Sequence, residues 1–293
     1  MKIIDVHMHF SNITVFEECA KYSSLLDYSE RGFYKETEEN EVVYSICMGL
    51  TENAANTFPD NNTETPMTAN KTDTMPKGMF LCLGINPYAL NDGNLKKTEN
   101  MIKNNSRVAG IKIYAGYYHF DVSDKIYNPA YNIAEKYDIP VVIHTGETFS
   151  ERGLLVYSHP LCIDRLAVER PDMKIMISHM GAPWAFDACE VTYKNRNVYM
   201  DISGLLVGSA EFIAKKAAQP LLTDRYKQAL VFLDSYNKVI FGTDWPLVPL
   251  KPYIAFCKML VPPETYEQVF YDNAAGLFKI NVPDFGSPPQ GVP

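Results

Sequence analysis

The chain has 293 residues, and its 27 basic and 35 acidic side chains give a formal net charge of −8. Hydrophobic residues make up 46% of the chain, so the composition excludes wholesale disorder. An acidic chain lacks the basic face that nucleic acid requires, so we expect no nucleic-acid partner. No apolar run approaches the ~18 residues of a bilayer span, so we expect no membrane partner.

The cysteines and the first residues of the chain bear on its compartment. The 6 cysteines are widely scattered and include no C-x-x-C pair. The N-terminus reaches charged residues and a histidine before an apolar run builds, which argues against a secretory signal. These features predict a cytoplasmic protein with reduced cysteines.

Eight short apolar runs, rich in β-branched residues, recur along the chain, and we expect each to form a strand. They are Lys2–His9, Val42–Gly49, Gly78–Ile85, Val108–Tyr114, Pro140–Thr145, Met173–His179, Asn197–Ser203 and Lys238–Thr243. Helical segments lie between most of them, such as Asn128–Asp138 and Leu161–Glu169. Strands that alternate with helices indicate an α/β protein with a parallel sheet. Eight repeats favour a distorted, single-domain (β/α)8 TIM barrel over residues 1–282, rather than an open doubly wound sheet.

Two segments break this pattern. Residues 53–77 follow the second strand and are rich in Asn, Thr, Asp and Pro, so we expect a long loop or lid. Residues 283–293 contain Pro, Gly and Ser, and we expect a C-terminal tail.

The six histidines all fall at strand ends or in segments that follow strands. In a barrel these positions share the C-terminal face, where barrel enzymes build their sites. His7 and His9 are two apart on the first strand, so we expect both to face the barrel mouth and Val6 and Met8 to face the helices. Two converging imidazoles are suited to a metal, and a hydrogen-bonded polar pair is the alternative.

Three more polar residues, His144, His179 and Asp244, end or follow apolar strands. A satisfied core residue is the alternative for each histidine alone, but a carboxylate in this place is costly unless it is paired or metal-bound. Together with the first-strand histidines they predict a divalent metal site, with zinc or another transition metal. Such an ion lowers the pKa of bound water toward ~7, and an aspartate beside that water would accept its proton.

The ordered motifs of the chain resemble those of the amidohydrolase superfamily. They are Asp5–His9, Gly110–Ile113, His144–Gly146, Ser178–Gly181 and Gly242–Pro246. The resemblance runs from the first strand to the last. It is closest to the amidohydrolase-related branch (amidohydrolase 2), which includes the aminocarboxymuconate semialdehyde decarboxylase-like enzymes.

The resemblance implies a role for each residue of the predicted site. His7, His9, His144 and Asp244 would be metal ligands, usually of zinc, with manganese or another ion as the alternative. His179 would be the catalytic histidine beside a single metal, or else a ligand of a second ion. Asp244 would also act as the catalytic base.

Four residues are candidates for substrate binding. We expect the Lys112 ammonium, at the end of the fourth strand, to pair with a substrate carboxylate; a structural ion pair or a carboxylated lysine is the alternative. His159 and Arg152 follow the fifth strand and would hold a polar or anionic substrate, unless they are merely solvated. Tyr114 belongs to an aromatic patch that would line the pocket, with a packed loop as the alternative.

These residues favour a metal-dependent hydrolase that acts on a small-molecule amide, ester or lactone through a metal-activated water. A metal-dependent, non-oxidative decarboxylase of a small carboxylated substrate would use the same ligands and is the alternative. A non-enzymatic barrel that binds a metal or a ligand is a third hypothesis. A homodimer is expected from the family resemblance alone.

Overall fold

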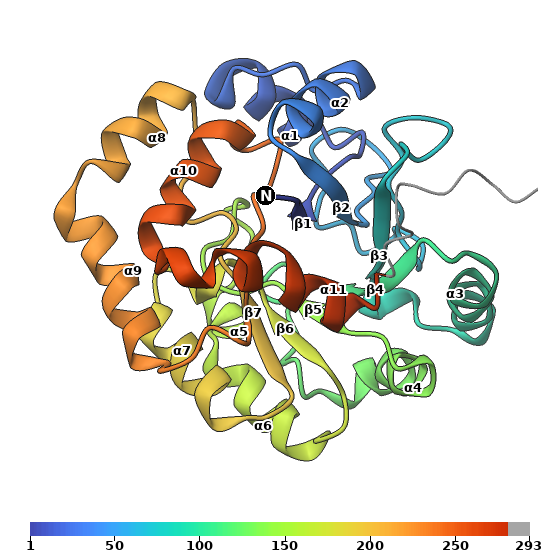
Figure 1. The fold of residues 1–293 in the computed structure, drawn as a ribbon. Helices are drawn as coiled ribbons and strands as arrows, with labels where there is room; N and C mark the ends of the chain where they lie inside the picture. Colours follow the sequence, from blue (N-terminus) through green and yellow to red (C-terminus); the bar gives the residue numbers. More distant parts are fainter. Residues whose placement is uncertain (281–293) are drawn as a thin grey trace, which may run out of the picture.

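Eight parallel strands form one sheet in the order β1 to β8, each hydrogen-bonded to the next along the chain. The structure is a computed structural model that describes residues 1–280, so the expected tail at 283–293 lies outside the described residues. The strands are β1 (Ile3–Met8), β2 (Val42–Met48), β3 (Met79–Ile85), β4 (Val108–Ile113), β5 (Val141–Ile143), β6 (Ile175–Ile177), β7 (Val198–Asp201) and β8 (Val239–Ile240). Each lies within one of the eight predicted runs, and the predicted barrel is confirmed (Figure 1).

Helices surround the strands and form the outer layer of the barrel (Figure 1). They are α1 (Thr14–Cys19), α2 (Glu30–Glu39), α3 (Asp92–Asn104), α4 (Asn128–Tyr137), α5 (Leu155–Ser158), α6 (Leu161–Glu169), α7 (Ala185–Lys194), α8 (Ala210–Ala217), α9 (Pro220–Phe232), α10 (Leu250–Leu260) and α11 (Asn273–Phe278). Single 3-10 or π turns join them at Ala20–Ser24, Pro87–Ala89, Lys125–Tyr127, Ser178–Gly181, Pro263–Thr265 and Gln268–Asp272. Ser29 and Ser209 cap α2 and α8 by accepting a backbone N–H of the first turn, as serine does at many helix starts.

The buried apolar side chains form two layers. An inner cluster fills the barrel and is closed at the N-terminal end by α11; it comprises Ile4, Val6, Ile46, Met48, Cys82, Ala109, Val142, Met176, Ile240, Ala274, Leu277, Phe278 and Ile280. A larger outer cluster packs the strands against the helices and includes Met8. The expectation that Val6 faces the helices was wrong, because β1 shifts register between Asp5 and Met8, which breaks the strict alternation of sides.

The ends of β1 and β8 close the barrel. The backbone N–H of Asp244 donates to the carbonyl of His7 at 2.7 Å, and the N–H of His9 donates to the carbonyl of Trp245 at 2.7 Å. Met8 and Trp245 form a parallel bridge beyond the two-residue strand β8. This closure places three predicted metal ligands, His7, His9 and Asp244, on adjacent backbones.

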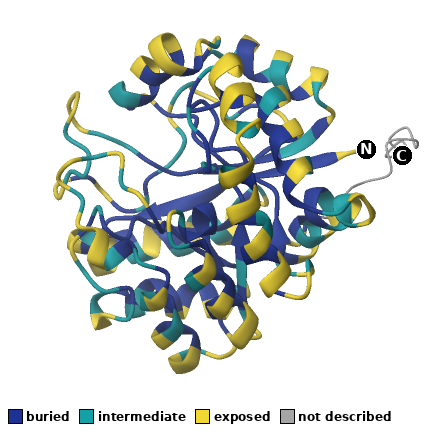
Figure 2. Cartoon of the chain, turned by 90° about the vertical axis from the view of Figure 1, so that its left-hand side faces the viewer, coloured by how far each residue is buried: buried dark blue, intermediate teal, exposed yellow. Residues whose placement is uncertain are grey.

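Residues 53–77 run between β2 and β3 without forming a helix or a regular strand. Met67 and Gly84 nevertheless exchange two backbone hydrogen bonds of 2.8 and 2.9 Å, which fix part of the segment beside β3. Long loops extend on the side of the molecule opposite the N-terminus (Figure 2). Among the described residues, none of the helices has the length and apolar character of a membrane span.

Candidate metal centre

Histidine and carboxylate side chains from both ends of the barrel sheet converge at its mouth. His7, His9 and Asp244 each offer a ligand atom within 4.8 Å of the others, and all three side chains are buried. His9 Nε2 lies 3.2 Å from Asp244 Oδ1, and His7 Nε2 lies 3.8 Å from the same oxygen. The ring of Phe16, from α1, stacks on His9 with centroids 4.4 Å apart and fixes the orientation of that imidazole.

Asp201, at the end of β7, orients His7. Its Oδ2 lies 2.9 Å from His7 Nδ1, and both side chains are fully buried. A carboxylate at this distance is the acceptor for an Nδ1–H, so Nε2 keeps the lone pair that a metal ligand needs. His7 thus has the carboxylate partner that metal-binding histidines commonly have.

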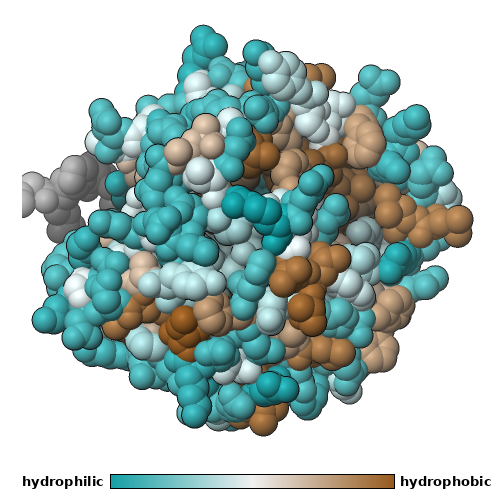
Figure 3. Space-filling view, turned by 180° about the vertical axis from the view of Figure 1, so that it is seen from behind, coloured by the Kyte–Doolittle hydropathy of each residue, from teal (hydrophilic) through white to brown (hydrophobic). Residues whose placement is uncertain are grey.

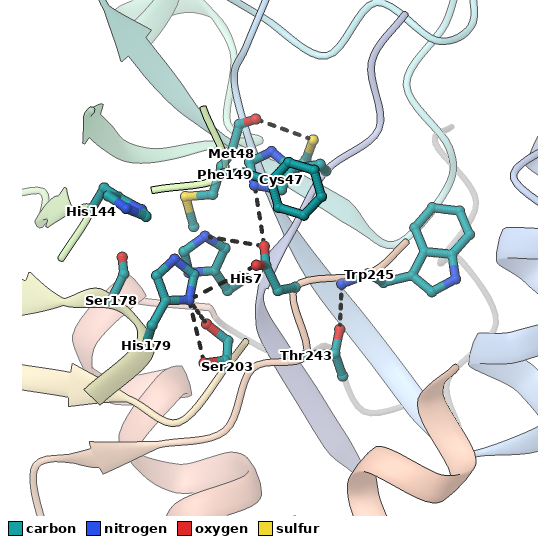
Figure 4. Close-up of polar contacts among 12 residues, drawn as sticks. His7, Cys47, Met48, His144, Phe149, Ser178, His179, Ser203, Thr243 and Trp245 are labelled. Carbon is teal, nitrogen blue, oxygen red and sulfur yellow. Dashed lines mark hydrogen bonds and ion pairs between the residues drawn. The ribbon is translucent and has the colours of Figure 1, made fainter. Parts of the chain in front are cut away.

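His179 follows β6 in a left-handed backbone conformation, with φ 59°. Its N–H donates to Asp201 Oδ1 at 2.9 Å, and its Nδ1 lies 2.9 Å from Ser203 Oγ (Figure 4). The Ser203 hydroxyl donates its own proton to Asp201, so it accepts from an Nδ1–H of His179. His179 Nε2 is therefore an acceptor and carries no proton in this network.

Asp244 is a second residue of the site with a left-handed backbone, at φ 72°. Such conformations are costly for residues other than glycine and are concentrated at functional sites. At position 204 the backbone is left-handed too, with φ +62°, and an added Cβ would lie 2.7 Å from His179 Nδ1 and 3.1 Å from Asp244 Oδ2. Glycine at position 204 therefore lets the side chains of His179 and Asp244 keep their positions, which a residue with a Cβ would not.

The electrostatics favour neutral imidazoles around an ionised carboxylate. Burial lowers the pKa of His7 and of His9, and it lowers the pKa of His179 to about 4. Burial by itself would raise the pKa of Asp244, but the surrounding imidazoles outweigh it and hold that pKa well below its usual range. Neutral histidine and ionised aspartate are the forms that bind a divalent cation.

An unsatisfied acceptor supports the assignment of this group to a metal. Asp244 Oδ1 is buried and, among the described residues, has no hydrogen-bond partner, although two imidazole nitrogens approach it. A buried carboxylate oxygen without a donor is costly, and a cation held between it and the imidazoles removes that cost. Nitrogen and oxygen donors of this kind suit zinc, manganese and related divalent ions. The residues present fit such an ion.

His144 lies in the same site but apart from this group. Its ring meets the ring of His179 edge-on at 5.0 Å, and its Nε2 lies 3.0 Å from the carbonyl oxygen of Glu147. A second group that could hold a metal comprises His7, His179 and Asp201, and His144 is in neither. Ligation by His144 stays a prediction, as does the choice between a catalytic and a ligating role for His179.

A cavity of about 750 Å³ opens above these residues and is lined by three of the four expected substrate-binding residues. Lys112 is fully buried, and its Nζ lies 2.9 Å from Ser178 Oγ and 3.3 Å from His7 Nε2. Tyr114 and Arg152 also line the cavity, whereas His159 does not line it and packs against Trp184, with the ring centroids 4.6 Å apart.

Two aromatic residues of the cavity were not among the predicted site residues. Phe58 extends from the 53–77 segment, and its ring packs against Tyr114 and Tyr117 with centroids 5.4 and 5.2 Å apart. The guanidinium of Arg152 donates to the Phe58 carbonyl and ties the segment to the cavity. Phe149, on the loop after β5, lines the mouth (Figure 4). Both belong to polar loops without a motif, so no signal in the sequence singles them out.

Comparison with known proteins places this geometry in a family. A profile described as amidohydrolase matches residues 4–280. The chain belongs to this amidohydrolase family. A comparison with curated proteins finds no match.

Several solved structures are similar in fold to this member of the family. A probable 2-pyrone-4,6-dicarboxylic acid hydrolase from Acinetobacter baumannii is 15% identical with a TM-score of 0.64, over 96% of this chain and 100% of the other. A 5-carboxyvanillate decarboxylase from Novosphingobium aromaticivorans, complexed with manganese, is 15% identical with a TM-score of 0.62, over 95% and 96%. A 2,6-dihydroxybenzoate decarboxylase from Rhizobium is 13% identical with a TM-score of 0.62, over 95% and 99%. At such identities the likeness concerns the fold.

Proposed function

We propose that this amidohydrolase is a metal-dependent hydrolase that acts on a small-molecule amide, ester or lactone, with zinc as its ion. The observation that carries the proposal is the group of His7, His9 and Asp244, whose ligand atoms converge beside the cavity. A divalent ion held there would polarise the reacting carbonyl and acidify a water molecule. The residues around it supply the remaining functions of a hydrolase.

Asp244 is suited to proton transfer. Its carboxylate is ionised, because the neighbouring imidazoles hold its pKa low, and Oδ1 has no hydrogen bond among the described residues. It accepts a proton from water as the water oxygen attacks the carbonyl carbon, and it returns the proton to the nitrogen or oxygen that leaves. His179 Nε2, left unprotonated by the Ser203 contact, accepts a hydrogen bond that orients the water.

A second candidate, non-oxidative decarboxylation, is favoured by Lys112. Its ammonium is buried in the cavity wall and, within residues 1–280, has no carboxylate within 4.0 Å, so a substrate carboxylate would be its missing counterion. Desolvation lowers the pKa of Lys112 to about 8, which leaves most of it charged at neutral pH. In this reaction the carbon–carbon bond to the carboxylate breaks, carbon dioxide leaves, and a proton takes its place on carbon.

Elemental analysis of protein purified without chelator tests the centre that both candidates share. We expect about one zinc per chain in the wild type and in His119→Ala, an exposed histidine outside the cavity. His9→Ala and Asp244→Asn are expected to lose the ion. Equal metal contents in all four proteins, or no metal in any, would refute the assignment.

A substrate panel on the zinc-loaded protein separates the two reactions. Amides, esters and lactones are assayed by acid release, and hydroxybenzoates by release of carbon dioxide. Hydrolysis that Asp244→Asn abolishes supports the proposal. Carbon dioxide release that Lys112→Met abolishes, without hydrolysis of the first set, would replace it with the decarboxylase.

A further inference from the structure

The cavity is larger and more apolar than a metal centre requires. The strand ends at its floor carry His7, His9, Lys112 and Asp244, and the loops around it add both apolar side chains and polar ones. The volume of about 750 Å³ is in the upper part of the range that holds whole drug-sized ligands. A reacting amide or ester group fills a small part of such a space, so most of it is available to the rest of the substrate.

The loop after β5 and the first residue of α5 bring large apolar side chains to the mouth of this cavity. Phe149 and Leu155 both line the cavity, yet they are 56% and 46% exposed. The loop is held by its backbone: the N–H of Phe149 donates to the Tyr117 hydroxyl at 2.8 Å, and the N–H of Leu154 donates to the Gly116 carbonyl at 2.8 Å. The two apolar side chains, named here the apolar rim, are thus held in the mouth without being buried.

Further apolar residues continue this surface across the mouth. Val15, on α1, and Val207, between β7 and α8, are both partly exposed and line the cavity. Hydrophobic groups gather on one side of the face seen in Figure 3, opposite to the view of Figure 1. Apolar surface that stays exposed and runs into a cavity is typical of a ligand-binding groove.

Of the charged side chains at the mouth, Arg152 and Glu52 are hydrogen-bonded to the protein's own backbone, and Glu147 also lines the cavity. Arg152 donates to the carbonyl of Phe58, so its guanidinium is turned toward the 53–77 segment. Glu52 accepts the N–H groups of Thr14, Thr57 and Phe58 and serves the same segment. Both side chains are thus engaged by backbone groups rather than by the apolar rim.

We propose that the substrate carries an acyl or alkyl chain that lies along Phe149 and Leu155 while its carbonyl group faces the histidines. The proposal rests on the proposed function for the position of the carbonyl, and it adds the chemical class of the rest of the substrate. An apolar chain that covers the two side chains removes their surface from water, which is favourable in proportion to the area covered.

Calorimetric titration with a homologous series of carboxylates tests whether the site binds an alkyl chain. Butanoate, hexanoate and octanoate carry the same charge and differ only in methylene groups, and they are titrated into the metal-loaded protein. Each fully buried methylene strengthens binding about fourfold, so we expect octanoate to bind at least tenfold more tightly than butanoate. Phe149→Ala and Leu155→Ala should flatten this dependence, because they should weaken octanoate binding more than butanoate binding.

Val156→Ala is the matched control. Val156 is next to Leu155 on α5 and is 67% exposed, but it does not line the cavity. It should keep the wild-type dependence on chain length. Equal affinities across the series in the wild type, or a wild-type slope in Phe149→Ala, would overturn the proposal.

Hydrolysis of 4-nitrophenyl butanoate and octanoate, measured on the same proteins, separates this proposal from the proposed function. If both esters are hydrolysed at the same rate and the carboxylate affinities do not depend on alkyl-chain length, the proposed alkyl-chain site is refuted and the hydrolase is not. If the carboxylate affinity rises with alkyl-chain length but neither ester is hydrolysed in a metal-dependent way, the alkyl-chain site is supported and the hydrolase is refuted.

Discussion

Replacing Gly204 by alanine should damage the metal centre far more than the fold. The added Cβ would lie 2.7 Å from His179 Nδ1, whereas ordinary contact begins at 3.4 Å, so the imidazole must move by 3.4 − 2.7 = 0.7 Å. It would also press on Asp244 Oδ2, at 3.1 Å. Since a shift of about 1 Å in a catalytic group costs about 100-fold in rate, we expect at least a tenfold loss of activity.

The effect on stability should be modest. An alanine at φ +62° costs about 1–2 kcal/mol, because its Cβ approaches the following carbonyl oxygen. For 293 residues the unfolding entropy is about 0.6 kcal/mol/K, so Tm should fall by about 2–3 °C.

Mn²⁺ titration, a thermal melt and the hydrolysis assay measure these effects together. Gly276→Ala is the control, because Gly276 lies in α11 with no atom within 4 Å of the added Cβ. It should keep the wild-type metal affinity and activity, with an unchanged or slightly higher Tm. A Gly204→Ala protein with wild-type Mn²⁺ affinity and activity would show that His179 and Asp244 do not need their present positions.

Three further substitutions test separate parts of the argument. Asp201→Asn removes the acceptor that fixes the His7 tautomer and should weaken Mn²⁺ binding about 10–100-fold by calorimetry. Lys112→Met should weaken octanoate binding at least tenfold without lowering Tm, because it removes a buried ammonium without a carboxylate partner among the described residues. Hydrogen bonds from Lys194 and Asn195 lower the pKa of Asp164, so the ionised carboxylate stabilises the fold above its unfolded pKa near 4. The free energy of unfolding of the wild type should therefore exceed that of Asp164→Asn by at most about 1 kcal/mol at pH 7. Urea titrations should show this difference shrinking toward pH 2.

Each of these expectations has a contradicting result. Unchanged Mn²⁺ affinity in Asp201→Asn would mean that His7 needs no partner to bind metal. Equal octanoate affinity in Lys112→Met would remove the amine from ligand binding. A stability gap that is constant from pH 7 to pH 2 would show that Asp164 does not act through its charge.

The barrel was predictable because its signal repeats. Each of the eight strands is an apolar run, and α6 matches the predicted Leu161–Glu169 at both ends. The structure ends β5 and β6 two residues earlier than predicted, at Ile143 and Ile177, because strand pairing stops there and the polar residues that the predicted runs included lie beyond it. The polar residues at those ends were identified for the same reason: a histidine or aspartate that interrupts an apolar run is conspicuous.

The parts that were missed depend on distant segments. The role of Gly204 follows from its contact with His179 and Asp244, on two other loops, and nothing in the neighbouring sequence encodes that contact. The inward position of Val6 results from a register shift against β2, which alternation of side chains does not reveal. His159 was expected at the substrate, but a tryptophan from the next loop packs on its ring instead.

The hydrogen bonds that close the barrel also decide when the metal centre can exist. His7 and Asp244 are adjacent in space but 237 positions apart in the chain, so the predicted metal ligands come from the first strand and from the residues after the last one. A nascent chain that has released only its first half carries His7 and His9 without their carboxylate. The ion can therefore bind at the complete site only after β1 and β8 have paired, and it then stabilises the closed barrel. A chain truncated before β8 would lack the metal centre however well its earlier strands had folded.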